Sequence, residues 1–259
     1  MSPDHPVPAR RVPAGAEGPA FSVCTLVTDL AAYGAMRESF AARGFTPGAA
    51  EFLYLDNTGG NRWDAFSGIP LLLAAARGRH VILCHQDVRL IEDGAAQLAA
   101  RLAALDRLAP CWAIAGNAGR TAAGDYRIRI SDPHGEDVRR GELPARVVSL
   151  DENFLVLRGG VPLGLSHDLA GFHLYGADLC LHARLAGRSA WVIDFHLRHL
   201  SAGRVDAAFH ALQARMEAKY AAAIAGMARI PTPSTVLRVP RGLLARWWAA
   251  RRWRRRLGA

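Results

Sequence analysis

The sequence lacks several patterns that define common classes of protein. It has no GxGxxG after its first apolar run and no GxxxxGK[ST], so neither common glycine-rich phosphate loop is predicted. Its four cysteines include no CxxC pair, which argues against a zinc site and indicates free thiols in a reducing compartment. It also lacks a run of about 18 apolar residues, so no membrane-spanning helix is predicted.

Acidic residues are missing from the end of the chain. The stretch 236–259 holds eight arginines and no aspartate or glutamate, while the whole chain carries a net charge of +9. Without those eight charges, about +1 remains for everything before the stretch. A nearly neutral body argues against a nucleic-acid groove, so we expect no nucleic-acid partner there.

The two ends are predicted to differ from the body. Residues 1–20 contain five prolines and no apolar signal segment, which indicates a disordered arm. Residues 231–259 form a basic tail rich in tryptophan and arginine, suited to an anionic membrane surface. A solvated tail or a protein or nucleic-acid contact is the alternative. We expect a cytoplasmic protein, docked at the inner membrane face through this tail.

The body, residues 21–230, is predicted to be one α/β domain. Strand-like apolar runs at 21–28, 51–57, 81–84 and 111–117 alternate with helical patterns, one of which Ser67 would cap. Near-continuous apolar strands indicate a mostly parallel, Rossmann-like sheet with helices on both faces. Residues 118–145 are less regular and predict a functional excursion or a short antiparallel ribbon. A strand pair around Asp151, a helix after Asp178, a strand at 189–195 and a helix at 205–227 complete the domain.

Polar residues follow three of these strands, namely Thr28–Asp29, Asp56–Asn57 and the triplet from His85 to Asp87. Because parallel strands end at one edge of a sheet, these residues are predicted to lie together where such folds bind ligands. Each acid could instead cap a helix or form a turn. With no glycine loop for phosphate, a hard divalent cation held by carboxylate oxygen is the natural substitute.

Four segments resemble the family 2 glycosyltransferases of the GT-A type. They are "LYLDNTGG", "SGIPLLLAAARGRHVILCHQDV", "FHLYGADLCLHARLAG" and "HLSAG", in this order within residues 22–203. The nearest subset is the one named after a streptomycin-biosynthesis protein. The resemblance implies a GT-A-type fold with a nucleotide-sugar site at the sheet edge.

The resemblance also implies roles for particular residues. Asp56 and Asn57, with Thr28 beside them, would bind the nucleotide. His85-Gln86-Asp87 occupies the slot of an Asp-x-Asp motif that binds ribose and Mg²⁺ or Mn²⁺ on the diphosphate. Asp87 would be a metal ligand, and imidazole in place of the first acid would favour Mn²⁺. His199 resembles a histidine that reaches the metal or the diphosphate.

Three further residues would act on the acceptor side. Asp178 resembles the family's general base, although the usual acidic pair is here Tyr175–Gly176, and a helix-capping role is the alternative. His173 would orient the acceptor, or it is a structural histidine. Asp151 would touch the acceptor or the sugar, or it is a turn residue.

The predicted function is transfer of a sugar from a nucleotide-diphosphate donor to a glycan, lipid-linked or small-molecule hydroxyl, with inversion. The alternative is a degenerate nucleotide-sugar-binding or scaffold protein. A nucleotidyltransferase is disfavoured because no glycine- and arginine-rich loop follows the first strand.

Overall fold

The structure is a computed structural model that describes residues 18–203, 205–226, 229–231 and 236–238, together with Trp247 and Arg251. The chain divides into two compact units, Met1–Arg204 and Val205–Ala259. The predicted arm lies outside the described residues up to residue 17, as does most of the predicted tail. The carbonyls of Pro19 and Ala20, at the end of the predicted arm, accept backbone hydrogen bonds from Arg79 and His80.

The first unit alternates strands and helices and then adds short strands. Its elements in chain order are β1 (Phe21–Val27), α1 (Leu30–Ala42), β2 (Ala50–Asp56), α2 (Ala65–Ala75), β3 (His80–Cys84), β4 (Val88–Leu90), α3 (Ala95–Leu108), β5 (Trp112–Gly116), β6 (Ala118–Arg120), β7 (Tyr126–Asp132), β8 (Gly135–Arg140), β9 (Ala145–Val147), β10 (Ser149–Leu150), β11 (Phe154–Arg158), α4 (Tyr175–Leu185), β12 (Ser189–Val192) and β13 (Leu197–His199).

The second unit contains α5 (Ala207–Gly226) and a hairpin of β14 (Arg229–Pro231) and β15 (Val236–Arg238). Among the described helices of the whole chain, none combines the length and the apolar character needed to cross a bilayer.

The main sheet has seven strands in the order β2-β1-β3-β11-β5-β12-β9. The pairs β2–β1, β1–β3 and β5–β12 are parallel, whereas β11 runs antiparallel between β3 and β5, and β9 runs antiparallel to β12. Five of the seven strands therefore point the same way, and the predicted α/β class with a mostly parallel, Rossmann-like sheet is confirmed. The predicted domain limits at residues 20 and 230 stay a prediction.

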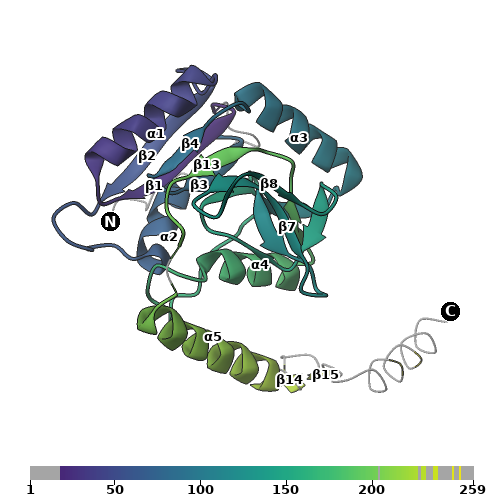
Figure 1. The fold of residues 1–259 in the computed structure, drawn as a ribbon. Helices are drawn as coiled ribbons and strands as arrows, with labels where there is room; N and C mark the ends of the chain where they lie inside the picture. The colour runs from purple at the N-terminus through teal and green to yellow at the C-terminus, as the bar shows by residue number, and fades with distance from the viewer. Residues whose placement is uncertain are drawn as a thin grey trace, which may run out of the picture. The chain divides into compact units, whose positions relative to one another are not determined.

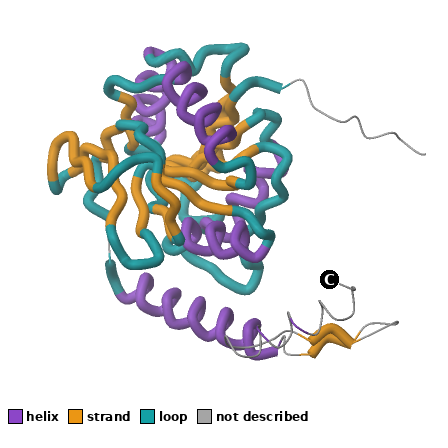
Figure 2. Tube along the Cα trace, turned by 90° about the vertical axis from the view of Figure 1, so that its right-hand side faces the viewer, coloured by secondary structure: helices purple, strands orange, loops and turns teal. Residues whose placement is uncertain are grey.

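Helices cover both faces of this sheet (Figure 1). α1 and α3 pack on one face, where side chains of alternate strand residues such as Val23, Ile82 and Phe154 form one continuous core with them. α2 contacts β1 and β2, and α4 contacts β5, β10 and β12, on the other face. Figure 2 shows orange strands running through the middle of the first unit, with purple helices above and below them.

A second, six-stranded sheet accounts for most of the irregular stretch. β10, β6, β7, β13 and β4 follow one another in it, and β8 pairs with β7. β6, β7 and β8 are antiparallel neighbours, so the predicted antiparallel ribbon is present. The predicted cap of α2 was wrong, because Asp64 is the N-cap and Ser67 stands at the third helical position, completing a capping box.

Candidate functional site

The ends of β1, β2 and β3 meet at one edge of the main sheet. The strands are parallel, with Val27 paired to Asp56 and Cys24 paired to Leu83. Thr28, Asp56 and His85 each follow or end one of these strands, so they share the edge at which open α/β sheets bind ligands. The predicted convergence of polar strand ends is present.

Gln86 joins the first strand end to the third. Its Oε1 accepts hydrogen bonds from the backbone N–H of Thr28 at 2.9 Å and of Asp29 at 3.0 Å, and its Nε2 donates to Thr28 Oγ1 at 2.8 Å. One amide thus satisfies two backbone donors and a hydroxyl. Gln86 had no predicted role, but its contacts position the loop that carries His85 and Asp87.

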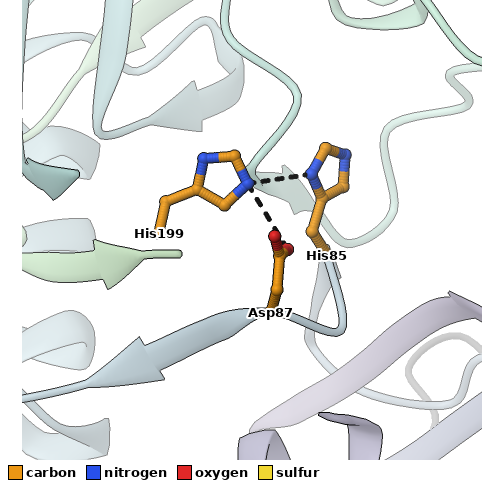
Figure 3. A group of neighbouring side chains, drawn as sticks. All are labelled: His85, Asp87 and His199. Carbon is orange, nitrogen blue, oxygen red and sulfur yellow. Dashed lines mark hydrogen bonds and ion pairs between the residues drawn. The ribbon is translucent and has the colours of Figure 1, made fainter. Parts of the chain in front are cut away.

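His85, Asp87 and His199 bring their ligand atoms within 4.8 Å of one another (Figure 3). His85 and Asp87 lie in the turn between β3 and β4, and β13 delivers His199 by pairing antiparallel with β4, where His199 stands opposite Val88. His199 Nε2 lies 3.3 Å from His85 Nδ1 and 3.4 Å from Asp87 Oδ1. Residues far apart in the chain therefore form one cluster.

The donor atoms of this cluster fit a divalent cation. His199 Nε2 faces His85 Nδ1, Asp87 Oδ1 and, at 3.1 Å, Ser201 Oγ. A ring nitrogen has only one hydrogen or one lone pair, so it cannot satisfy three partners at once. Ligands about 2.1 Å from one metal lie roughly 3.0–3.4 Å apart, which matches the two distances above. Two imidazoles and a carboxylate form a set that binds first-row transition metals.

Tyr175, the first residue of α4, sets the tautomer of His85. The Tyr175 hydroxyl donates its proton to the carbonyl oxygen of Glu152 at 3.1 Å, and the same hydroxyl lies 3.1 Å from His85 Nε2. Because a phenol has one proton, its oxygen must accept from His85 Nε2–H. The lone pair of a neutral His85 is then on Nδ1, the atom that faces Asp87 and His199. Sequence reasoning missed this role of Tyr175.

Electrostatics in the cluster favour an ionised Asp87 and a neutral His85. Burial pushes the pKa of Asp87 up, but hydrogen bonding and charge from His199, with help from Ser201 and His85, hold that pKa well below its usual range. Burial lowers the pKa of His85, and the charge of His199 lowers it further, against smaller opposing effects of Asp87 and Asp151. Metal ligands need these protonation states.

Asp56 and Asn57 differ although they are adjacent. Asp56 is exposed, and hydrogen bonds from the side chain and the backbone of Thr58 lower the pKa of its carboxyl. Asn57 is buried and holds the loop that follows β2, since its Nδ2 donates to the Trp63 carbonyl and its Oδ1 accepts from the Trp63 N–H. Asp56 can therefore meet a ligand, whereas Asn57 is occupied in the loop.

The side chain of Asp178 is not accessible from the solvent. Its side chain is fully buried, and its two oxygens accept from the backbone N–H and the hydroxyl of Ser166, each at 2.8 Å. The carboxylate thus ties the loop before α4 to the helix. A base must reach the proton it removes, and the contacts with Ser166 cover this carboxylate, so the base role named for Asp178 stays a prediction.

Three other residues surround the start of α4. Asp151 is exposed, and its Oδ1 accepts from the backbone and the side-chain amide of Asn153. His173 is half-buried and near enough to the cluster for its charge to lower the pKa of His85. Glu152, which the sequence analysis gave no role, is half-buried, and its Oε1 accepts from the N–H of Gly176 at 3.2 Å.

A surface hollow of about 350 Å³ lies elsewhere, between α1 and β2. Its walls include Gly34, Ala41, Phe45 and Phe52, and it contains none of the predicted site residues. Since it offers Arg37 and Glu38 as its only charged groups, we assign no chemistry to it.

The fold and the cluster define the class of this protein: an α/β chain with a candidate metal centre where the parallel strands end. No family model matches the chain. It is 46% identical over 206 residues to "ATP synthase subunits region ORF 6" of Fuscovulum blasticum, covering 77% of this chain and 83% of that protein. The chain therefore belongs to the family of that protein.

Solved structures show more distant likeness. The crystal structure of S. aureus TarS 1–349 is 11% identical with a TM-score of 0.47, over 70% of this chain and 60% of that chain. Its complex with UDP-GlcNAc is 12% identical with a TM-score of 0.48, over 71% of this chain and 59% of that chain. A197 from STIV is 10% identical with a TM-score of 0.40, over 72% of this chain and 86% of that chain. Likeness at this level carries no conclusion about function.

Proposed function

We propose that the protein is a glycosyltransferase that moves a sugar from a nucleotide-diphosphate donor to a hydroxyl acceptor, with inversion. The observation that supports this function best is the meeting of His85, Asp87 and His199 at the edge where β1, β2 and β3 end. A cation bound there would face a ligand lying across the strand ends, where Asp56 is exposed. The resemblance of the same segments to family 2 glycosyltransferases supports the donor class.

His85, Asp87 and His199 would hold Mn²⁺ or Mg²⁺, and the two imidazoles favour Mn²⁺. When bound, such a cation supplies positive charge for the departing diphosphate. Asp87 brings the negative charge of the ligand set, and its low pKa keeps it ionised at neutral pH. His85 would offer Nδ1, because Tyr175 occupies its other nitrogen.

The exposed Asp56 would accept hydrogen bonds from the base or the ribose of the nucleotide. Its Oδ1 already accepts from Thr58 N and Oγ1, which orients the carboxylate and leaves its second oxygen for a ligand. Thr28 follows β1, whose last residue, Val27, pairs with Asp56, so it lies at the same strand edge. Asp151 would lie on the side of the transferred sugar, near His85, whose pKa its charge affects.

A nucleotide-sugar-binding protein without catalysis is the second candidate. The burial of Asp178 favours this candidate, because both carboxylate oxygens of the residue that resembles the family's base accept hydrogen bonds from Ser166. Turnover separates the two candidates, since both would bind the donor.

A thermal-shift screen of UDP-, GDP-, CDP- and dTDP-sugars with and without Mn²⁺ tests donor binding. A ligand at 100 times its dissociation constant should stabilise the fold by about 2.7 kcal/mol. We expect a shift that needs Mn²⁺ and disappears in Asp87→Asn, and we expect the wild type to release nucleoside diphosphate. Binding without release would support the non-catalytic candidate, and no binding of any donor would contradict both.

We also propose that the basic tail docks on anionic membrane, where a lipid-linked acceptor would be met. Most of the tail lies outside the described residues, but Trp247 is 49% exposed, and the Arg251 guanidinium lies 4.3 Å from its ring centroid. Co-sedimentation with vesicles containing phosphatidylglycerol should fall when the chain is truncated after Pro233. Equal pelleting of both forms would refute the docking.

A further inference from the structure

The proposed transfer needs a group that removes the proton of the acceptor hydroxyl. Asp178 is closed off by Ser166, and Asp87 belongs to the metal cluster. The required group must lie beside the cluster and remain open to a ligand. Glu152 is a partly buried carboxylate that lies against the start of α4 and is linked to the cluster through Tyr175.

Glu152 is one hydrogen-bonded residue away from the cluster. Its backbone carbonyl accepts from the Tyr175 hydroxyl at 3.1 Å, and that hydroxyl lies 3.1 Å from His85 Nε2. Its side chain turns to the first turn of α4, where Oε1 accepts from the N–H of Gly176. The residue as a whole is half-buried, and the contact with Gly176 fixes the direction of its carboxylate.

The close packing around Gly176 explains why residue 176 carries no acidic side chain and why the carboxylate at this place belongs to Glu152. A Cβ atom on Gly176 would lie 2.6 Å from the Leu150 carbonyl oxygen and 3.3 Å from Glu152 Cγ. No side chain at position 176 fits without a shift of the backbone. The Leu150 carbonyl and the Glu152 side chain together fill the space that a side chain at position 176 would need, and Glu152 brings its carboxylate there from the β10–β11 turn.

The surroundings of Glu152 also suit proton transfer near neutral pH. Burial, assisted by the negative charge of Asp151, raises the pKa of Glu152 to about 8, against the lowering effect of the N–H groups of Gly176 and Leu174. A base works best when its pKa lies near the working pH. Leu174 itself has a left-handed backbone, with φ of 59°, which is unusual for a residue other than glycine and is held in place beside these contacts.

We propose that Glu152 is the catalytic base of this site, an inference that rests on the proposed function. Glu152 accepts the proton of the acceptor hydroxyl as the hydroxyl oxygen forms its bond to the anomeric carbon. The bond from that carbon to the diphosphate oxygen breaks, and its electron pair leaves with the diphosphate. When water replaces the acceptor, the same step releases the free sugar and the nucleoside diphosphate.

The competing explanation is that Glu152 only caps α4, whose N-cap residue makes no side-chain hydrogen bond of its own. Glu152→Gln separates the two roles, because the glutamine oxygen can still accept from Gly176 N–H but cannot take up a proton. Glu142→Gln, at an exposed position, is the matched control.

The experiment measures nucleoside diphosphate release with the donor and Mn²⁺ identified by the screen, over pH 6–9. For Glu152→Gln we expect a fall in kcat of about 100-fold or more, loss of the alkaline rise in rate, unchanged donor and Mn²⁺ binding, and unchanged thermal stability at pH 6. Glu142→Gln should behave as wild type. If Glu152→Gln turns over the donor as fast as the wild type, Glu152 is not the base, and the proposed function stands. A wild type that binds donors but never turns them over would overturn the proposed function, and with it the base.

Discussion

Asp178 and Glu152 are two carboxylates beside the same helix with opposite surroundings. Asp178 lies in the first turn of α4, fully buried, and both of its oxygens are occupied by Ser166. Glu152 comes from the turn before β11, is half-buried, and is held by backbone N–H groups of the helix start. A sequence motif can therefore place an acid on the expected helix, while a neighbouring loop, here the one with Ser166, determines whether the carboxylate is accessible.

The largest expected effect concerns Asp178. Asp178→Ala leaves the N–H and the hydroxyl of Ser166 without their charged partner inside the protein, so the free energy of unfolding should fall by about 3 kcal/mol. Urea denaturation measures this loss. If Asp178→Ala keeps its stability and loses only turnover, Asp178 is the reactive acid and the comparison is reversed.

The second effect is the pH dependence of stability that Glu152 produces. Its pKa is raised in the folded state to about 8, so folding favours the protonated form. This stabilisation is complete below the unfolded pKa, near 4.5, and is lost as the pH rises through about 8.

Urea denaturation at pH 5 and at pH 8.5 checks this sign. Relative to Glu152→Gln, the wild type should lose on the order of 2 kcal/mol between the two pH values, allowing for solvent screening at a half-buried group. A parallel pH dependence of the two proteins would show that Glu152 titrates normally.

The third effect concerns Tyr175, whose hydroxyl lies between His85 and the carbonyl of Glu152. Tyr175→Phe removes the acceptor of the His85 Nε2–H, and loss of such a supporting contact should weaken Mn²⁺ binding about tenfold. Isothermal titration measures the affinity, and nitrogen NMR of the metal-free protein at alkaline pH reports the His85 tautomer. Tyr126→Phe, at an exposed ring on β7, is the control. A wild-type His85 protonated on Nδ1 would contradict the assignment.

The smallest effect concerns Gln86. Gln86→Ala removes three hydrogen bonds at a partly solvated loop, so we expect a loss of about 1 kcal/mol in unfolding free energy. Gln86→Glu keeps the accepting oxygen for Thr28 N and Asp29 N and should lose less. Equal losses in both variants would indicate that these hydrogen bonds do not position the loop.

The first strands and their shared edge were predictable from the sequence. Apolar runs and helical periodicity repeat with short connections, and consecutive parallel strands must end on one side. Thr28, Asp56 and His85 therefore come together as expected. The antiparallel insertion of β11 between β3 and β5 was not predicted, because strand order depends on contacts that no local pattern records.

The residues that contact the metal cluster from outside were harder to predict than the three residues that form it. Asp87 and His199 were identified through the resemblance, but Tyr175 and Glu152 act through contacts between separate elements that have no spacing rule. The signal available was the pair Tyr175–Gly176 at the place of an expected acidic pair. Where this pair is missing, another acid has to supply the carboxylate, and Glu152, next to Asp151, lies in the right place.

Pulsed EPR of Mn²⁺ bound to the full chain tests the proposed metal centre. We expect one tightly bound Mn²⁺ per chain, with nitrogen couplings from two imidazoles that decrease to one in His199→Ala. Binding that shows no imidazole coupling, or that persists unchanged in Asp87→Asn, would contradict a metal centre formed by His85, Asp87 and His199.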